Sequence, residues 1–220
     1  MARPRSAGFE GQRELILAAA AQLFAQRGYS SSTMAEVAAA SGISKATLYH
    51  YVRDKQDLLA QITTTHLQRL QTLVLAVAAQ RLPPEEHLCE LVLRFMQVYE
   101  NAQAEHRVLT EDVKFLPEQQ QGGASDADGC GSATPSPRQQ VLQGQRQVVQ
   151  AVADAVAALR PELMHAGLHK PVAMLLFGMM NWTFTWLHAG GPLSHQDVAH
   201  LLLRVFLGGI QALQPQHSTA

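Results

Sequence analysis

Apolar residues recur three and four positions apart along almost the whole chain, whereas the alternating pattern of a strand is nearly absent. This spacing places the apolar side chains on one face of an α-helix. The first such stripe contains Leu15, Ile16, Ala19, Ala20, Leu23 and Phe24. The pattern therefore predicts an all-α fold that opens with a helix over residues 13–27.

Prolines and glycines separate the helices that the rest of the pattern predicts. These helices cover residues 58–80, 85–104, 106–116, 139–159, 170–188 and 194–213, and Pro83, Pro161 and Pro192 lie in the breaks. Residues 117–138 have no apolar period and are rich in Gly, Ser, Pro and Asp. We expect a mobile loop there, because such a segment cannot bury enough apolar surface to hold one conformation.

The stretch that begins at Thr33 combines a short helix, a tight turn and a second short helix. Thr33 is placed to cap the first helix, and Glu36 at its third position completes a capping box. Gly42 ends this helix where a left-handed residue is needed, and Ser44 is placed to cap the second. With Leu48 as the apolar anchor of the second helix, this spacing predicts a helix-turn-helix.

The second helix of this pair would present Lys45, Thr47, Tyr49 and His50 outward. Such a helix fits the major groove of B-DNA, with the side chains near its N-terminus closest to the base edges. Lys45 and Thr47 are therefore the candidate base-reading residues. Tyr51 is expected to pack in the core, since Tyr49 and Tyr51 cannot both face the groove.

Residues 12–59 resemble the N-terminal domain of the TetR family of bacterial transcriptional regulators. The matching features are the helix RELILAAAAQLFAQRGY with its closing Gly28 and Tyr29, the segment AEVAAASGISKATLYHYV after Thr33, and Lys55 with Leu58 and Leu59. One position that is usually aromatic, after Tyr51, holds Val52. The resemblance implies that residues 1–57 bind palindromic operator DNA, and that residues 58–220 form a helical ligand-binding and dimerisation domain.

The resemblance also suggests roles in DNA binding. In this family the residues that match Tyr49 and Lys55 grip phosphates. Thr33 and Ser44 lie at helix N-termini and can add hydroxyl and backbone donors to a phosphate. His50 is either a contact to phosphate or bases, or simply an exposed histidine. The predicted DNA-binding residues are Thr33, Ser44, Lys45, Thr47, Tyr49, His50 and Lys55.

The last two predicted helices are more apolar than burial on one side requires. Their apolar positions include Val172, Leu175, Leu176, Met179, Met180, Leu187, Val198, Leu201, Leu202, Val205, Phe206, Leu207, Ile210 and Leu213. A helix that is apolar on nearly all sides is buried on nearly all sides, so a second copy of the chain is expected to cover them. The TetR family forms its homodimer through the last two helices. The competing interpretation is a plain monomeric core.

In the TetR family the middle helices hold a ligand pocket, so aromatic and methionine residues there are candidates for its lining. They are Phe95, Met96, Tyr99, Phe115, Met179, Asn181, Trp182, Thr183 and Trp186. For each residue alone, ordinary core packing is the competing interpretation. Arg94 and Arg107 would either bind an anionic part of the ligand or form ion pairs on a helix surface.

The segment GMMNWTFTWLHAGGPLS resembles the C-terminal part of TetR-type regulators linked to fatty-acid or aromatic-acid degradation, some of which respond to CoA thioesters. The small-molecule effector that this implies is an acyl-CoA or aromatic-acyl-CoA. One alternative is a regulator of efflux that responds to hydrophobic drugs. Another is an architectural DNA-binding protein without an effector, which would need few of the roughly 160 residues that follow the helix-turn-helix.

The charge of the chain agrees with a local DNA site rather than with general coating of nucleic acid. The net charge is −1, but residues 1–57 hold 7 Lys and Arg against 5 Asp and Glu, while the remainder holds 10 against 13. The cationic part therefore coincides with the helix-turn-helix, as attraction to phosphates requires.

Other functional classes find little support in the sequence. There is no Gly-rich phosphate loop, nucleophile elbow or HExxH motif, so no enzyme, cofactor or metal site is expected. His165 and His169 are separated by Gly167 in a turn, and His195 and His200 are not expected to share one helix face. With two cysteines, no apolar secretory segment and no run of transmembrane length, a cytoplasmic protein is expected.

Overall fold

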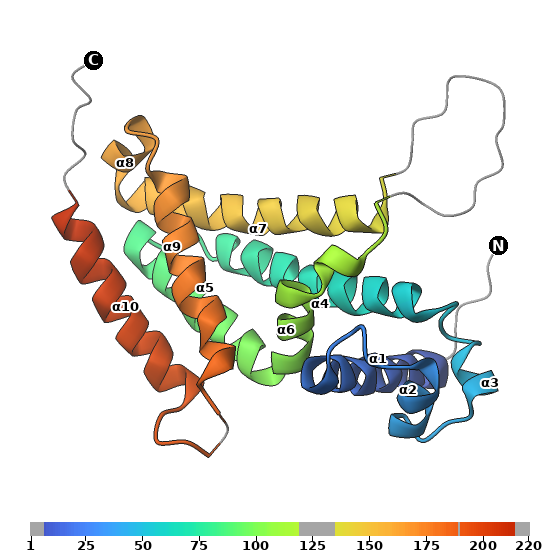
Figure 1. Cartoon of the computed structure of the whole chain (residues 1–220). Coiled ribbons are helices and arrows are strands. Elements are labelled where there is room, and N and C mark those ends of the chain that lie inside the picture. The colour runs from blue at the N-terminus through green and yellow to red at the C-terminus, as the bar shows by residue number, and fades with distance from the viewer. Residues whose placement is uncertain (1–6, 119–134, 189, 214–220) are drawn as a thin grey trace, which may run out of the picture. The chain divides into compact units, whose positions relative to one another are not determined.

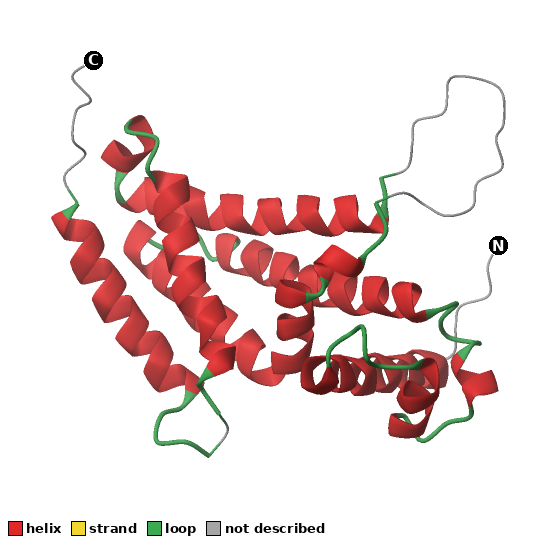
Figure 2. Cartoon of the chain, viewed as in Figure 1, coloured by secondary structure: helices red, strands yellow, loops and turns green. Residues whose placement is uncertain are grey.

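A computed structural model describes residues 7–118, 135–188 and 190–213, and all regular elements in these ranges are helical (Figures 1 and 2). The all-α prediction is confirmed. The elements are α1 (Ala7–Arg27), α2 (Met34–Ala40), α3 (Lys45–Leu48), α4 (Lys55–Ala78), α5 (Pro84–Asn101), α6 (Gln103–Glu111), the 3₁₀ helix η1 (Val113–Phe115), α7 (Pro137–Leu159), α8 (Pro161–His165), α9 (His169–Asn181), the 3₁₀ helix η2 (Trp182–Thr185) and α10 (His195–Ala212).

The chain folds into two compact units. Among the described residues, the first unit holds 7–67, 104–118 and 135–143, and the second holds 68–103, 144–188 and 190–213. Helices α4 and α7 run from one unit into the other. The compact units therefore do not coincide with the domains predicted to meet between residues 57 and 58. That boundary was predicted between a DNA-binding and a ligand-binding domain, and it stays a prediction.

The first unit is built on one apolar face of α1. Ile16, Ala20 and Phe24 are almost fully buried on this face, whereas Leu15 is 63% exposed. The buried face thus lies one residue further along the helix than the predicted stripe. α1 packs against α2, and α2 packs against α3. Between α4 and α6, the buried His66 Nε2 and His106 Nδ1 lie 3.2 Å apart and share a hydrogen bond.

The second unit is organised around α5, which lies beside α10, while α10 also contacts α9 (Figure 1). Its buried apolar side chains include Leu88, Leu91, Val92, Phe95 and Met96 of α5. Phe95 and Phe177 pack edge to face with ring centroids 5.7 Å apart, which joins α5 to α9. No helix among the described residues is long and apolar enough to cross a bilayer.

Several helix boundaries differ from the predicted ones. The helix predicted over residues 170–188 ends as an α-helix at Asn181, and η2 follows. In this region the hydroxyl of Thr183 donates to the carbonyl of Met180 at 2.7 Å, and that of Thr185 donates to Trp182 at 2.7 Å. Such bonds compete with the regular helical pattern. The short α8 was not predicted.

The loop predicted over residues 117–138 falls largely on residues 119–134, which lie outside the described residues. At its C-terminal end, α7 begins at Pro137 rather than at residue 139, so the predicted loop is too long by two residues on that side.

The C-terminal end of α10 is closed by Arg160, which lies between α7 and α8. Its guanidinium donates to the carbonyl oxygen of Ile210 and, at 3.0 Å, to that of Leu213, and it also pairs with Glu162. The last carbonyls of a helix have no partner inside the helix, so a cation placed there satisfies them. Arg160 therefore holds the end of α10 within the second unit.

We predict that Arg160→Gln lowers the free energy of unfolding by about 1–2 kcal/mol, because charge-assisted hydrogen bonds to two carbonyls are lost. Urea unfolding of the variant measures this change. Arg146→Gln, at an exposed position of α7, is the matched control and is expected to leave stability unchanged. Equal effects of the two substitutions would contradict a specific role for Arg160.

Candidate DNA-binding site

The first helix of the helix-turn-helix begins with the predicted capping box. The hydroxyl oxygen of Thr33 accepts from the Glu36 amide at 3.3 Å, and the Thr33 amide donates to Glu36 Oε2 at 2.8 Å. The hydroxyl of Thr33 also donates to this carboxylate, which lowers the pKa of Glu36. The Thr33 hydroxyl is thus used inside the protein, although the residue itself is exposed.

The turn and the second helix also follow the expected chemistry. Gly42 has a φ of +66°, which is the left-handed conformation that its position required. Ser44 caps α3 by accepting from the Thr47 amide at 3.0 Å, and the two hydroxyls lie 2.8 Å apart. Leu48 is fully buried and anchors α3.

The predicted DNA-contacting side chains of this helix lie close together in the sequence and reach the surface. Lys45, Tyr49 and His50 are exposed and Thr47 is half-buried, but α3 itself covers only Lys45–Leu48. Tyr49 and His50 therefore follow the helix in a turn rather than continuing it. Tyr51 is half-buried and stacks on Phe9 of α1 at 4.5 Å, consistent with the packing role expected for it.

The ammonium of Lys55 is bound by the backbone of the turn between α1 and α2. Its ammonium donates to the carbonyl oxygens of Tyr29, Ser30 and Ser32 at 2.8, 3.2 and 2.8 Å, and it lies 4.4 Å from the centroid of the Tyr29 ring. An ammonium has three hydrogens, so these bonds use all of them. Lys55 therefore holds the turn between α1 and α2 in the protein without DNA, and its contact with a phosphate stays a prediction.

Phe115, predicted to line a ligand pocket, lies beside the residue that precedes this turn. Its ring stacks on that of Tyr29 at 5.1 Å with an interplanar angle of 25°, and Lys114 Nζ lies 5.2 Å from the Phe115 centroid. Burial raises the pKa of the Tyr29 hydroxyl. Within the first unit, η1 thus supports the turn from which α2 starts.

The other predicted ligand-binding residues, all in the second unit, occupy two different environments. Phe95, Met96, Tyr99 and Thr183 are core residues, and the hydroxyl of buried Tyr99 donates to Asn181 Oδ1 at 3.1 Å. Met179, Trp182 and Trp186 are 37%, 66% and 48% exposed. The predicted pocket lining is therefore divided between core and surface, because neighbouring residues on a helix point in different directions.

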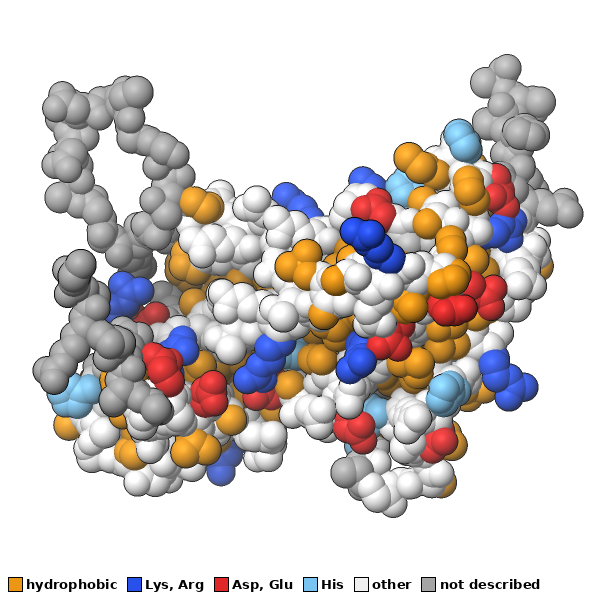
Figure 3. Space-filling model, turned by 180° about the vertical axis from the view of Figure 1, so that it is seen from behind, with side chains coloured by type: hydrophobic (Ala, Val, Ile, Leu, Met, Phe, Trp, Pro, Cys, Tyr) orange, Lys and Arg blue, Asp and Glu red, His pale blue; other side chains and the backbone are white. Residues whose placement is uncertain are grey.

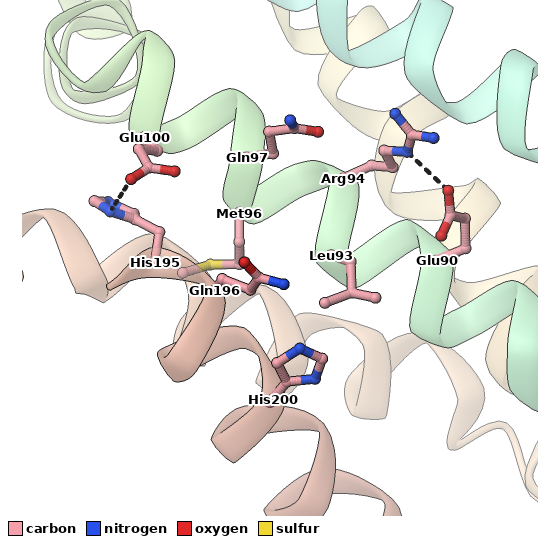
Figure 4. A pocket seen from close by; sticks show the side chains of 9 residues that line it. All are labelled: Glu90, Leu93, Arg94, Met96, Gln97, Glu100, His195, Gln196 and His200. Carbon is pink, nitrogen blue, oxygen red and sulfur yellow. Dashed lines mark hydrogen bonds and ion pairs between the residues drawn. The ribbon is translucent and has the colours of Figure 1, made fainter. Parts of the chain in front are cut away.

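A groove of about 350 Å³ does lie between α5 and α10 of the second unit (Figure 4). Its lining is Glu90, Leu93, Arg94, Met96, Gln97, Glu100, His195, Gln196 and His200. Of the residues predicted to bind the ligand, Met96 alone is among those that line this groove. His195 and His200 both line this groove, which does not require them to share one face of α10.

The charged side chains of this groove are largely paired with one another (Figure 4). Arg94 Nε donates to Glu90 Oε1 at 2.7 Å, and His195 Nδ1 lies 3.6 Å from Glu100 Oε1. Arg94 is therefore a helix-surface ion pair, as one of the two interpretations expected. Arg107 likewise pairs with Glu111 at 3.0 Å. No cluster of three or more His, Cys, Asp or Glu suited to a metal occurs among the described residues.

We predict that Lys55→Met lowers the free energy of unfolding by about 1–3 kcal/mol, because the carbonyls of the α1–α2 turn lose a charged donor. Thermal and urea unfolding measure the loss. Lys114→Met removes an exposed cation beside the same aromatic stack and is expected to change stability by less than about 0.5 kcal/mol. An unchanged stability of Lys55→Met would mean that the three hydrogen bonds do not hold the turn.

Both parts of the chain match known family descriptions. Residues 16–62 match the bacterial regulatory proteins of the tetR family, and residues 129–210 match the tetracyclin repressor-like C-terminal domain. A TetR-family transcriptional regulator of known structure from Bordetella parapertussis 12822 is 30% identical with a TM-score of 0.78, and the match covers 92% of this chain and 97% of that one. The chain belongs to the TetR family, and is a helix-turn-helix transcriptional regulator rather than an enzyme.

Two further relatives are similar over most of their length. The HTH-type transcriptional repressor KstR2 from Mycolicibacterium smegmatis is 24% identical over 206 residues, which cover 92% of each chain. The structure of AibR in complex with isovaleryl coenzyme A and operator DNA is 21% identical, with a TM-score of 0.65 and coverage of 88% of this chain and 97% of AibR. At this identity the likeness to AibR concerns the fold.

Proposed function

We propose that this chain is a one-component repressor that binds a palindromic operator as a homodimer and releases it when a small-molecule effector binds. The observation that carries the DNA-binding part is the capped helix-turn-helix with Lys45, Tyr49 and His50 exposed beside it. Lys45 and Thr47 would read bases, and His50 would contact phosphate or bases. The proposed phosphate contacts are Thr33, Ser44, Tyr49 and Lys55. Such a protein acts on chromosomal DNA, so its proposed location is the cytoplasm.

The proposed homodimer forms through α9 and α10. Large apolar side chains are exposed on these helices and on the adjoining η2: Met174, Leu175, Met179, Trp182, Leu201 and Val205 are between 37% and 68% exposed. Large apolar side chains that are exposed together on one surface favour association with a matching apolar surface. Two copies also meet a need of the DNA site, since two recognition helices must reach major grooves about 34 Å apart or more.

We predict that the double substitution Leu175→Asp and Val205→Asp yields a monomer whose operator affinity falls by about a hundredfold or more, because two linked half-site contacts become independent. Sedimentation and DNA binding measure the two effects. Leu75→Asp, at a leucine of α4 that is 71% exposed, is the matched control and should leave the dimer intact. A double variant that still sediments as a dimer would locate the interface elsewhere.

The proposed effector is an acyl-CoA or aromatic-acyl-CoA. The resemblance of residues 178–194 to regulators of acid catabolism and the isovaleryl coenzyme A bound to the similarly folded AibR support this class. The effector would favour a conformer with a different separation of the two recognition helices, transmitted through α4. A hydrophobic drug is the alternative effector, and an architectural protein would have none.

We predict that the purified protein binds the intergenic DNA beside its own gene, and that one CoA thioester weakens this binding by roughly 5- to 150-fold, the usual range of allosteric coupling. Titration of labelled DNA in the presence of a panel of thioesters and free CoA tests both parts. Specific binding without release by any thioester would keep the regulator and reject this effector class. Release by an apolar drug alone would favour the efflux alternative.

A further inference from the structure

The groove between α5 and α10 has no part in the DNA binding or the dimer proposed above. Its lining belongs to the second unit, and Leu201 and Val205, proposed for the homodimer, are not among its described lining residues. On the face shown in Figure 3, basic and acidic side chains of the described residues are intermixed rather than gathered by sign. That face therefore offers no extended field of one sign, and the side chains of the groove itself decide which ligand it suits.

We propose that this groove binds an aliphatic primary amine, with the ammonium at Glu100 and the apolar chain along Leu93 and Met96. Figure 4 shows Glu100 at one end of the groove and Glu90 at the other, with Leu93 and Met96 between them. Met96 is 1% exposed and Leu93 is half-buried, so the two form an apolar floor. An alkyl chain that covers this floor leaves water, while its charged end stays among polar groups.

Carboxylates outnumber cations in the lining of the groove. Glu90 and Glu100 are opposed by Arg94 alone, which leaves one negative charge when the histidines are counted as neutral. Arg94 Nε donates to Glu90 at 2.7 Å, whereas Glu100 Oε1 lies 3.6 Å from His195 Nδ1, beyond hydrogen-bond distance. The Glu100 side chain is 51% exposed. Glu100 is therefore the carboxylate that a ligand ammonium can reach and pair with.

Two glutamines extend the set of acceptors at the same end. Gln97 follows Met96 on α5, and Gln196 lines the groove from α10, where Figure 4 shows its side chain beside that of Met96. An ammonium has three hydrogens, and each amide side chain carries one carbonyl oxygen that can accept. Glu100 and the two glutamines thus match the number of donors that a primary amine brings.

The same composition argues against two other occupants. A phosphate would meet the excess of negative charge, so the groove does not suit the phosphates of the CoA thioester proposed above. A transition metal in a protein takes three or more side-chain ligands, and the part of the chain that the structure describes contains no such group of His, Cys, Asp and Glu. An organic cation is the class that fits both the charge and the floor.

Binding of hexylamine to the full-length protein, measured by isothermal titration calorimetry, tests the proposal. Hexanol and hexanoate keep the alkyl chain and change the end group, and both should bind at least about tenfold more weakly because the charge-assisted hydrogen bonds are lost. Affinity should rise about two- to fourfold for each methylene from butylamine to octylamine, as burial of the chain in the groove requires.

Three variants locate the site. Glu100→Gln is expected to weaken hexylamine binding at least about tenfold while the thermal midpoint of the ligand-free protein stays unchanged. Glu86→Gln removes the same charge at an exposed position of α5 outside the groove, and this matched control should bind hexylamine as the wild type does. Leu93→Ser should reduce the dependence of affinity on chain length, because part of the apolar floor is lost.

Three results would each overturn the proposal. Hexanol or hexanoate that binds as tightly as hexylamine would mean that the ammonium is not recognised. Equal losses in Glu100→Gln and Glu86→Gln would mean that the amine is attracted by charge in general. An affinity that does not change with chain length would place the alkyl chain outside the groove. These measurements use no DNA, so their outcome is independent of the proposed repressor function.

Discussion

The DNA-binding end of the molecule depends on the Lys55 ammonium and the three carbonyl oxygens that surround it. This contact joins the first residue of α4 to the turn from which α2 begins, and the Tyr29 ring lies beside the same charge. An ammonium that is partly removed from water must have its hydrogens satisfied, so the turn and the helix cannot shift independently. Along the chain, the capping box of Thr33 and Glu36 comes directly after this turn, and the recognition helix α3 comes after α2.

A different constraint governs the second unit, where the helices contain more apolar surface than one core can bury. The inward faces of α5, α9 and α10 form a well-packed centre around Phe95 and Phe177. Leu175 and Val205 on the same helices remain mostly exposed. A second copy of the chain that covers these side chains would explain the excess of apolar surface. The same dimer would supply the two recognition helices that the proposed DNA site needs.

Arg53 and Lys55 show how two cations of one short segment can point in different directions. Arg53 lies two positions before Lys55, the first residue of α4, yet the side chain of Lys55 faces the protein and that of Arg53 faces solvent. A resemblance of sequence transfers residue types between relatives, whereas the direction of a long flexible side chain depends on the groups around it. Tyr29, Ser30 and Ser32 supply those groups for Lys55 from more than twenty residues away.

By itself, the sequence determined the helical class, the family and the local chemistry of the helix-turn-helix. The caps at Thr33 and Ser44 and the turn at Gly42 were predictable because their partners lie within three or four residues.

Only the tertiary structure decided that Leu15 is exposed, that Phe115 stacks on Tyr29, and that His195 and His200 line one groove. It also divided the predicted ligand-binding residues between core and surface. These outcomes depend on contacts between segments far apart in the chain, which periodicity and spacing do not encode.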